Sequence, residues 1–174
     1  MSIQNCQENN NDVPRLAVAL GGGGARAAYQ VGVLRGIAAQ FPDLATPILT
    51  GVSAGGINVS FLANHTGTFR QKVEDLSHLW KHLGFSDVFE VRPARLLWQV
   101  AQVGMRLSIG APPGIPKVTG MVDTAPLRRF LKQTLNTCDG KLPGIAQNLA
   151  AGRLCAVALT ALNYATGESV TFVE

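Results

Sequence analysis

The chain has 174 residues, of which 47% are hydrophobic and 15% are charged, and its formal net charge is +4. This length suits a single domain with its own core, and the apolar content excludes a disordered protein. The basic residues are scattered singly apart from the pair Arg128–Arg129, which argues against a nucleic-acid-binding surface. No apolar run approaches the roughly 18 residues that span a bilayer, so we expect any membrane contact to be peripheral.

Residues 1–13 are polar and lack the basic segment and apolar stretch of a secretory signal. We expect them to form a disordered leader, and residues 14–174 to form one domain. The three cysteines, Cys6, Cys138 and Cys155, are widely spaced and match neither a disulfide framework nor a CxxC metal site. This pattern predicts reduced thiols in a cytoplasmic protein that holds no metal ion.

The first third of the chain repeats one pattern twice: a buried strand, a glycine-rich turn and a helix. The predicted strands are residues 15–20 and 47–50, which are short apolar runs bounded by proline or glycine. The predicted helices are residues 25–40 and about 54–64, where apolar residues recur at helical spacing. This alternation favours an α/β fold, with helices and a mainly parallel central sheet arranged as three α/β/α layers.

The rest of the chain adds helices first and strands afterwards. Predicted helices cover residues 69–83, 93–107 and 124–135, and predicted strands cover residues 154–162 and 169–173, with a turn at 163–167. The helix at 93–107 carries Trp98, Met105 and flanking arginines. That composition suits a lipid interface, although an apolar face of this kind also suits an ordinary core helix.

The sharpest motif is the Gly-x-Ser-x-Gly segment from Gly51 to Gly55. A serine between a strand and a helix is exposed by a sharp turn, and glycine two residues before and after it lets the backbone turn tightly. The helix that begins at Ala54 directs its positive dipole end toward any oxyanion that develops beside the serine. We therefore predict that Ser53 is a nucleophile.

A second motif, the four glycines Gly21–Gly24, follows the first strand. Consecutive glycines expose backbone N–H groups, which can form an oxyanion hole, cradle a phosphate or simply make a tight turn. The spacing of Gly22, Gly24 and Ala27 also fits a dinucleotide-binding loop. In such a loop, however, the acidic residue ends the second strand, whereas Asp43 precedes it. The oxyanion hole is the favoured interpretation, and the dinucleotide site stays an alternative.

Together the two motifs resemble the patatin-like phospholipase family. The resemblance rests on the strand at 17–20, the Gly-Gly-Gly-x-Arg loop, the helical segment 29–34 and the Gly-x-Ser-x-Gly turn, with weaker likeness at 122–128 and 166–172. It covers about residues 15–174. It implies a patatin-like fold and a lipid acyl hydrolase that uses a Ser–Asp dyad, without histidine, metal or cofactor, on phospholipids or other acyl esters.

The resemblance assigns roles to residues of this chain. Ser53 is the implied nucleophile; Gly22, Gly23 and Gly24 are the implied oxyanion hole; Arg26, Gly51, Ala54 and Gly55 are the implied supporting residues. Arg26 is expected to orient the loop or to meet anionic head groups, and a solvated arginine at a helix start fits the sequence equally well. Ala27 replaces the last glycine of the family's loop, a change that ordinary helical dihedrals tolerate.

The catalytic aspartate is the larger departure from the family pattern. The single Asp-Gly dipeptide, Asp139–Gly140, precedes the strand at 154–162, and its sequence is that of an exposed turn. The helix spacing places His65 roughly 18 Å from Ser53, and His78 and His82 lack a third metal ligand. We therefore expect a patatin-like domain that is truncated before its aspartate. The alternative is a fragment that binds lipid or a partner without turnover.

Overall fold

The computed structural model describes residues 16–84, 125–163 and 166–174. These residues fall into two compact units, which we describe separately. The first comprises the described residues up to His82 and from Leu135 onward, and it contains the sheet. The described part of the second is Leu83, Gly84 and helix α6 (Ala125–Thr134). The predicted helix at 93–107 lies outside the described residues.

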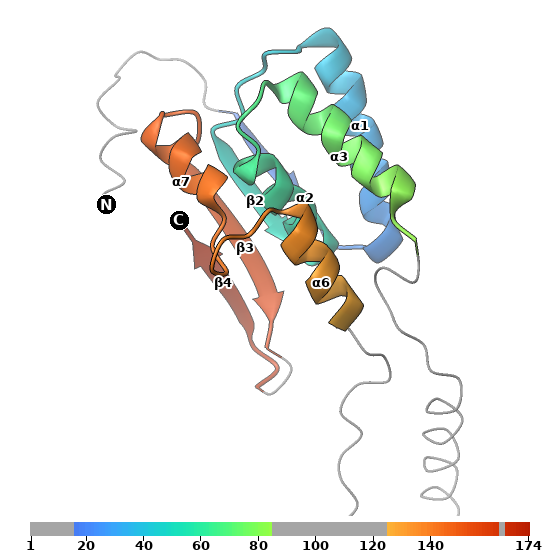
Figure 1. The fold of residues 1–174 in the computed structure, drawn as a ribbon, viewed down its shortest axis with the longest axis vertical. Coiled ribbons are helices and arrows are strands. Elements are labelled where there is room, and N and C mark those ends of the chain that lie inside the picture. The colour runs from blue at the N-terminus through green and yellow to red at the C-terminus, as the bar shows by residue number, and fades with distance from the viewer. Residues whose placement is uncertain (1–15, 85–124, 164–165) are drawn as a thin grey trace, which may run out of the picture. The chain divides into compact units, whose positions relative to one another are not determined.

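A four-stranded sheet organises the first unit (Figure 1). Its strands, in spatial order, are β1 (Ala17–Leu20), β2 (Ile48–Val52), β3 (Ala156–Leu162) and β4 (Ser169–Val173). The first three strands are parallel, and β4 pairs antiparallel with β3. The predicted α/β class and the mainly parallel sheet are confirmed. The second strand is longer than predicted, because it continues through Gly51 and Val52.

The helices of this unit follow the strands in the predicted order. They are α1 (Ala27–Gln40), preceded by a 3-10 turn at Gly24–Arg26, α2 (Ala54–Asn64), α3 (Phe69–His82) and α7 (Pro143–Ala150). The bounds of α2 agree with the prediction. Helix α7 was not predicted, although Pro143 at the first helical position is a usual start signal and Ile145 and Leu149 share one face.

The core lies between the sheet and these helices. Helix α2 packs against β1, β2 and β3, and α1 and α3 lie side by side (Figure 1). Inward-facing side chains of the sheet, such as Leu20, Leu49 and Val157, are buried, whereas the alternate residues Ala17 and Ala19 are exposed. This alternation follows from the period of two along a strand. Helix α2, which follows Ser53, has more buried residues than any other described helix of this unit.

Buried amides connect α7 to the C-terminal end of α2. The side-chain nitrogen of Asn148 donates to the carbonyls of Ala63, at 2.7 Å, and His65, at 3.1 Å. Arg153 Nε in turn donates to Asn148 Oδ1 at 2.8 Å. Asn148 is 1% exposed, so these bonds satisfy a polar group that solvent does not reach. The C-terminal end of α2 is therefore held by hydrogen bonds as well as by apolar packing.

One expectation about the cysteines is wrong. Cys155 is disulfide-bonded, whereas Cys138 is a free, exposed thiol. Wide spacing excludes a dense disulfide framework, but it does not exclude one bridge, because sequence spacing does not say which cysteines approach each other in the fold.

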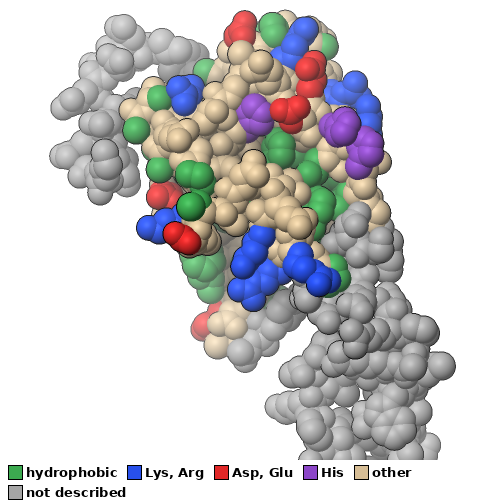
Figure 2. Space-filling model, viewed as in Figure 1, with side chains coloured by type: hydrophobic (Ala, Val, Ile, Leu, Met, Phe, Trp, Pro, Cys, Tyr) green, Lys and Arg blue, Asp and Glu red, His purple; other side chains and the backbone are tan. Residues whose placement is uncertain are grey.

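Among the described helices, none has both the length and the apolar character needed to cross a bilayer. On the face seen in Figure 2, acidic and basic side chains are interspersed over the region where α1 and α3 lie. This mixture differs from the single basic stripe that is typical of a nucleic-acid-binding surface.

Candidate active site

Ser53 is the single residue between the end of β2 at Val52 and the start of α2 at Ala54. Its backbone has φ 54° and ψ −124°, which is a strained combination for any residue other than glycine. The strain is maintained by the strand before Ser53 and the helix after it, whose amides at Gly56 and Ile57 donate to the Ser53 carbonyl at 2.9 and 3.3 Å. The turn exposes Ser53, as predicted for the serine of this motif.

The two glycines of the motif are required by close backbone contacts. A Cβ at Gly51 would lie 2.6 Å from the carbonyl oxygen of Gly55. A Cβ at Gly55 would lie 2.5 Å from the carbonyl oxygen of Gly21 and would also overlap Leu20. Gly55 therefore lets α2 approach the end of β1, and this contact brings the glycine loop next to Ser53.

The register of the sheet explains why the two motifs meet. Leu20, the last residue of β1, pairs with Gly51 in the parallel strand β2. The residues that follow both strands consequently leave the same edge of the sheet, where parallel α/β proteins usually bind ligands. A Cβ built on Gly22 would lie 3.2 Å from Ser53 Cβ and 3.9 Å from Ser53 Oγ. A side chain at Gly22 would therefore press on Ser53, so the loop passes close to the serine and leaves no room for a larger residue at this position.

The glycine loop has a backbone conformation that favours glycine. Gly23 has φ 155° and Gly24 has φ 56°. Among the described residues, the N–H groups of Gly22, Gly23 and Gly24 have no hydrogen-bond partner, and neither does that of Ala54. These four backbone donors are therefore available at the edge of the sheet where Ser53 lies.

Arg26 and Ala27 continue from the loop into α1. Arg26 is exposed, and its side chain folds back toward the loop, with Nε 3.5 Å from the Cβ position of Gly23. Ala27 has φ −62° and ψ −24° and is 1% exposed. These are ordinary helical dihedrals, so alanine fits where the family pattern has glycine.

No side chain in the described ranges is hydrogen-bonded to Ser53 Oγ. His65 begins the loop at the far end of α2, where its Nε2 lies 2.9 Å from an Asp75 carboxylate oxygen and its Nδ1 accepts from the Gly67 amide. Asp139 and Gly140 have φ 50° and 75° and form a two-residue hairpin turn between Cys138 and Lys141. Both arrangements are structural, as the sequence predicts for the Asp-Gly turn.

The two other histidines lie at the end of α3. The rings of His78 and His82 are stacked, with centroids 4.1 Å apart, and His82 Nδ1 lies 2.8 Å from the His78 carbonyl. Within the part of the chain that the structure describes, no group of three or more His, Cys, Asp or Glu side chains is placed to hold a metal ion.

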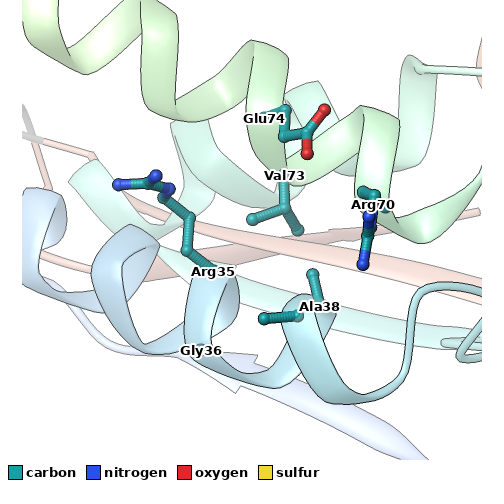
Figure 3. A pocket seen from close by; sticks show the side chains of 7 residues that line it. Arg35, Gly36, Ala38, Arg70, Val73 and Glu74 are labelled. Atoms are coloured by element: carbon teal, nitrogen blue, oxygen red, sulfur yellow. The ribbon is translucent and has the colours of Figure 1, made fainter.

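A separate hollow of about 410 Å³ lies between α1 and α3 (Figure 3). It is lined by Arg35, Gly36, Ala38, Ala39, Arg70, Val73 and Glu74. None of these residues belongs to the glycine loop or to the Ser53 turn. Figure 3 places Arg35 and Arg70 at opposite ends of the hollow, so the two guanidinium groups do not converge on a common point.

Two polar side chains beside the glycine loop were not singled out from the sequence. Gln30 donates to the Gly21 carbonyl at 2.8 Å, and Asn58 donates to Gln30 Oε1 at 3.4 Å. Gln30 lies nine residues from Gly21, and Asn58 lies 28 residues from Gln30. No local pattern reveals such contacts, because they form only when α1 and α2 pack together.

The fold and the site define an α/β protein in which a serine and a glycine-rich loop meet at the edge of a parallel sheet where the strands end. The chain belongs to the patatin-like phospholipase family, whose model matches residues 18–162. The matched range includes both the glycine loop and the Ser53 turn. The family supports hydrolase activity of the lipid acyl hydrolase type. Comparisons with curated proteins and with solved structures found no match.

Proposed function

We propose that this protein is a serine acyl hydrolase that cleaves the ester bonds of phospholipids or related acyl esters, with Ser53 as its nucleophile. The observation that carries the proposal is the close approach of a strained serine turn to a glycine-rich loop. Ser53, with its positive φ, lies against Gly22 of a loop whose amides have no partner among the described residues. The lipid substrate class is supported by the family.

In the proposed reaction, Ser53 Oγ forms a bond to the acyl carbonyl carbon, and the hydroxyl proton passes to a general base. The carbonyl oxygen becomes an oxyanion, which accepts hydrogen bonds from the N–H groups of the glycine loop and of Ala54. Collapse of the intermediate breaks the ester bond, and the alcohol leaves with a proton. Water then hydrolyses the acyl-enzyme and regenerates Ser53.

The proposed oxyanion donors are the amides of Gly22, Gly23 and Gly24, together with that of Ala54. Gly51 and Gly55 support them by allowing β2, α2 and the end of β1 to pack closely. Arg26, whose side chain lies near Gly23, is proposed to brace the loop. Since backbone donors are fixed by the fold, they need no reorganisation when the charge develops.

The general base implied by the family resemblance is an aspartate in an Asp-Gly-Gly or Asp-Gly-Ala sequence. Asp139 is unsuited to this role, because it sits in a hairpin turn and has no hydrogen bond to Ser53. We therefore keep a second candidate function: residues 14–174 bind lipid or a partner without turnover. A serine that lacks its base retains only the residual rate provided by the oxyanion hole and by substrate binding.

A fluorophosphonate probe distinguishes the two functions, because it reports on nucleophile activation. Ser53 Oγ displaces fluoride from the phosphorus, and intact mass measures the adduct. The first function predicts one adduct on the full chain that Ser53→Ala abolishes and that Ser169→Ala, at an exposed serine of β4, retains. A folded chain that gives no adduct contradicts this function and favours binding without turnover. Hydrolysis of a p-nitrophenyl ester by the same samples then measures turnover.

The dinucleotide-binding alternative finds less support. Asp43 lies in the turn between α1 and β2, ahead of the second strand, where it is not placed to bind a ribose. The glycine loop instead approaches Ser53. Stabilisation of the chain by NAD in a thermal melt would revive this alternative.

A further inference from the structure

We propose that Gln30 is a positioning residue that fixes the direction of the Gly22 N–H, and that Asn58 and Trp80 hold Gln30 in the required orientation. This inference rests on the proposed function, since Gly22 is one of its oxyanion donors. It assigns a role to a chain of three side chains, one on each of α1, α2 and α3. None of the three touches the reacting atoms.

The effect of Gln30 on Gly22 follows from the planarity of the peptide bond. In a trans peptide the C=O of one residue and the N–H of the next lie in one plane and point in opposite directions. Gln30 Nε2 donates to the Gly21 carbonyl at 2.8 Å, so it fixes the plane of the Gly21–Gly22 peptide. Holding the carbonyl on one side holds the Gly22 N–H on the other. Glycines at consecutive positions leave this plane free to rotate unless a partner fixes it.

The orientation of the Gln30 amide follows from two groups around Asn58: the Trp80 N–H, which can only donate, and the Ala27 carbonyl, which can only accept. The indole N–H of Trp80 is a donor only, so the Asn58 atom 2.7 Å from it must be the oxygen. Asn58 therefore directs its nitrogen toward the Ala27 carbonyl, at 3.2 Å, and toward the Gln30 side chain, at 3.4 Å. That contact requires the Gln30 oxygen to face Asn58. The Gln30 nitrogen is then left to donate to Gly21.

Burial favours this orientation of the Asn58 amide over the reversed one. Asn58 is 0% exposed, so a reversed amide would place its nitrogen against the indole N–H and its oxygen against the Ala27 carbonyl, without water to compensate. A buried polar group without a partner costs about 1–3 kcal/mol. Trp80 thus controls, through two amides, a peptide plane at the glycine loop. The hydrogen bond from Asn58 to Gln30 is the longest of the four, so it is the weakest link between Trp80 and the glycine loop.

The test compares backbone amide NMR spectra of the full 174-residue chain and its variants. Gln30→Glu keeps the length of the side chain, and its ionised carboxylate cannot donate to the Gly21 carbonyl, so the spectra are recorded at neutral pH. Gln30→Met removes the amide donor and acceptor together. Trp80→Phe keeps the aromatic ring and removes the single donor that orients Asn58. The proposal predicts that all three variants shift the amide signals of Gly22 and Gly23. Signals of Gly140 and Gly152, which lie in other turns, are expected to stay in place.

A matched control is Gln40→Met, the same substitution at an exposed position of α1. It lies ten residues, or about 15 Å of helix, beyond Gln30 and should leave the Gly22 signal unchanged. An unchanged Gly22 signal in Gln30→Glu and Gln30→Met overturns the proposal. If those variants shift the signal and Trp80→Phe does not, the relay through Asn58 is overturned. If Gln30→Glu does not fold, Gln30→Met decides.

Fluorophosphonate kinetics add a functional readout. A misdirected oxyanion donor should slow the maximal labelling rate of Ser53 by about tenfold, which is less than the 10²–10³-fold loss caused by deleting a donor. The probe concentration that gives half-maximal rate should not change. A variant that is merely less stable would instead lower the fraction of protein that becomes labelled, and the folded molecules would still react at the wild-type rate. If the wild-type chain does not react at all, the proposed hydrolase function fails, and the NMR comparison still decides whether Gln30 positions Gly22.

Discussion

Two sharp turns of this protein use positive φ angles, and they differ in what surrounds them. Asp139 and Gly140, with φ 50° and 75°, form an exposed hairpin turn, and a Cβ added to Gly140 would meet no atom within 4 Å. Ser53, with φ 54°, is flanked by Gly51 and Gly55, which have no room for a Cβ. A positive φ alone therefore does not mark a functional site. A strained residue other than glycine, held by close backbone packing, is the more informative signal.

The largest expected effect tests whether packing at the Ser53 turn depends on glycine. Gly55→Ala places a Cβ against the carbonyls of Leu20 and Gly21, so it should lower the free energy of unfolding by about 3 kcal/mol. Gly56→Ala is the matched control, because its Cβ would be 3.6 Å from the nearest atom. Alanine is also a better helix former, so this variant should equal or exceed the wild type by up to about 1 kcal/mol. Urea denaturation measures both, and equal losses contradict the account.

The second effect measures the strain at Ser53 itself. Glycine adopts φ 54°, ψ −124° readily, whereas serine and alanine do not. Ser53→Gly should therefore be about 1.5 kcal/mol more stable than Ser53→Ala, with fluorophosphonate labelling lost in both. Thermal or urea unfolding of the pair gives the difference. A less stable glycine variant would show that the turn is not strained.

The third effect sharpens the contrast with the hairpin turn. Gly140→Ala creates no contact, so its cost is only that of a non-glycine residue at φ 75°, about 1 kcal/mol. The labelling rate of Ser53 should not change. A destabilisation as large as that of Gly55→Ala would mean that backbone conformation, rather than packing, distinguishes the two turns.

The smallest effect concerns Lys72 on α3, outside both turns. Burial and, secondarily, the nearby charge of Arg153 lower the pKa of Lys72 from its usual 10.5. Between the lowered pKa of the folded state and 10.5, the folded state binds fewer protons than the unfolded state. The destabilising effect of the buried ammonium is therefore full at low pH and is lost as the pH rises through this interval. Lys72→Met should remove this pH dependence and stabilise the protein by a few tenths of a kcal/mol at pH 7, because solvent screens the half-buried ammonium.

The control for Lys72 is Lys81→Met, at an exposed position of the same helix. Urea unfolding at pH 7 and pH 10 should give a larger gain for Lys72→Met at the lower pH, and comparison with Lys81→Met separates the effect of burial from that of removing one surface charge. A gain that grows with pH contradicts the direction of the pKa shift.

Much of the fold was predictable because its signals are local. Short apolar runs predicted the strands, and α2 has the predicted bounds, since Ser53 and the glycines around it are visible in the sequence. Helix α7 was missed because its eight residues make only about two turns, too few for the spacing of Ile145 and Leu149 to stand out. The disulfide at Cys155 was missed because its formation depends on tertiary proximity.

The residues of the candidate site also fall into those that the sequence predicted and those that it did not. The backbone positions of Gly22, Ser53 and Gly55 were predictable, because few residue types fit a sharp turn or a close backbone approach. Gln30, Asn58 and Trp80 were not, because ordinary polar and aromatic residues occur on many helices. The role proposed for them rests on hydrogen bonds between residues 9 to 31 positions apart in the sequence.

The central claim is that Ser53 and the glycine loop form one oxyanion-binding site. A crystal structure of the full chain after reaction with a fluorophosphonate tests it most directly, since the phosphonyl oxygen on Ser53 Oγ mimics the oxyanion. The account predicts that this oxygen lies within about 3.1 Å of the amide nitrogens of Ala54 and of Gly22 or Gly23. An adduct whose oxygen points to solvent, away from these amides, would contradict it.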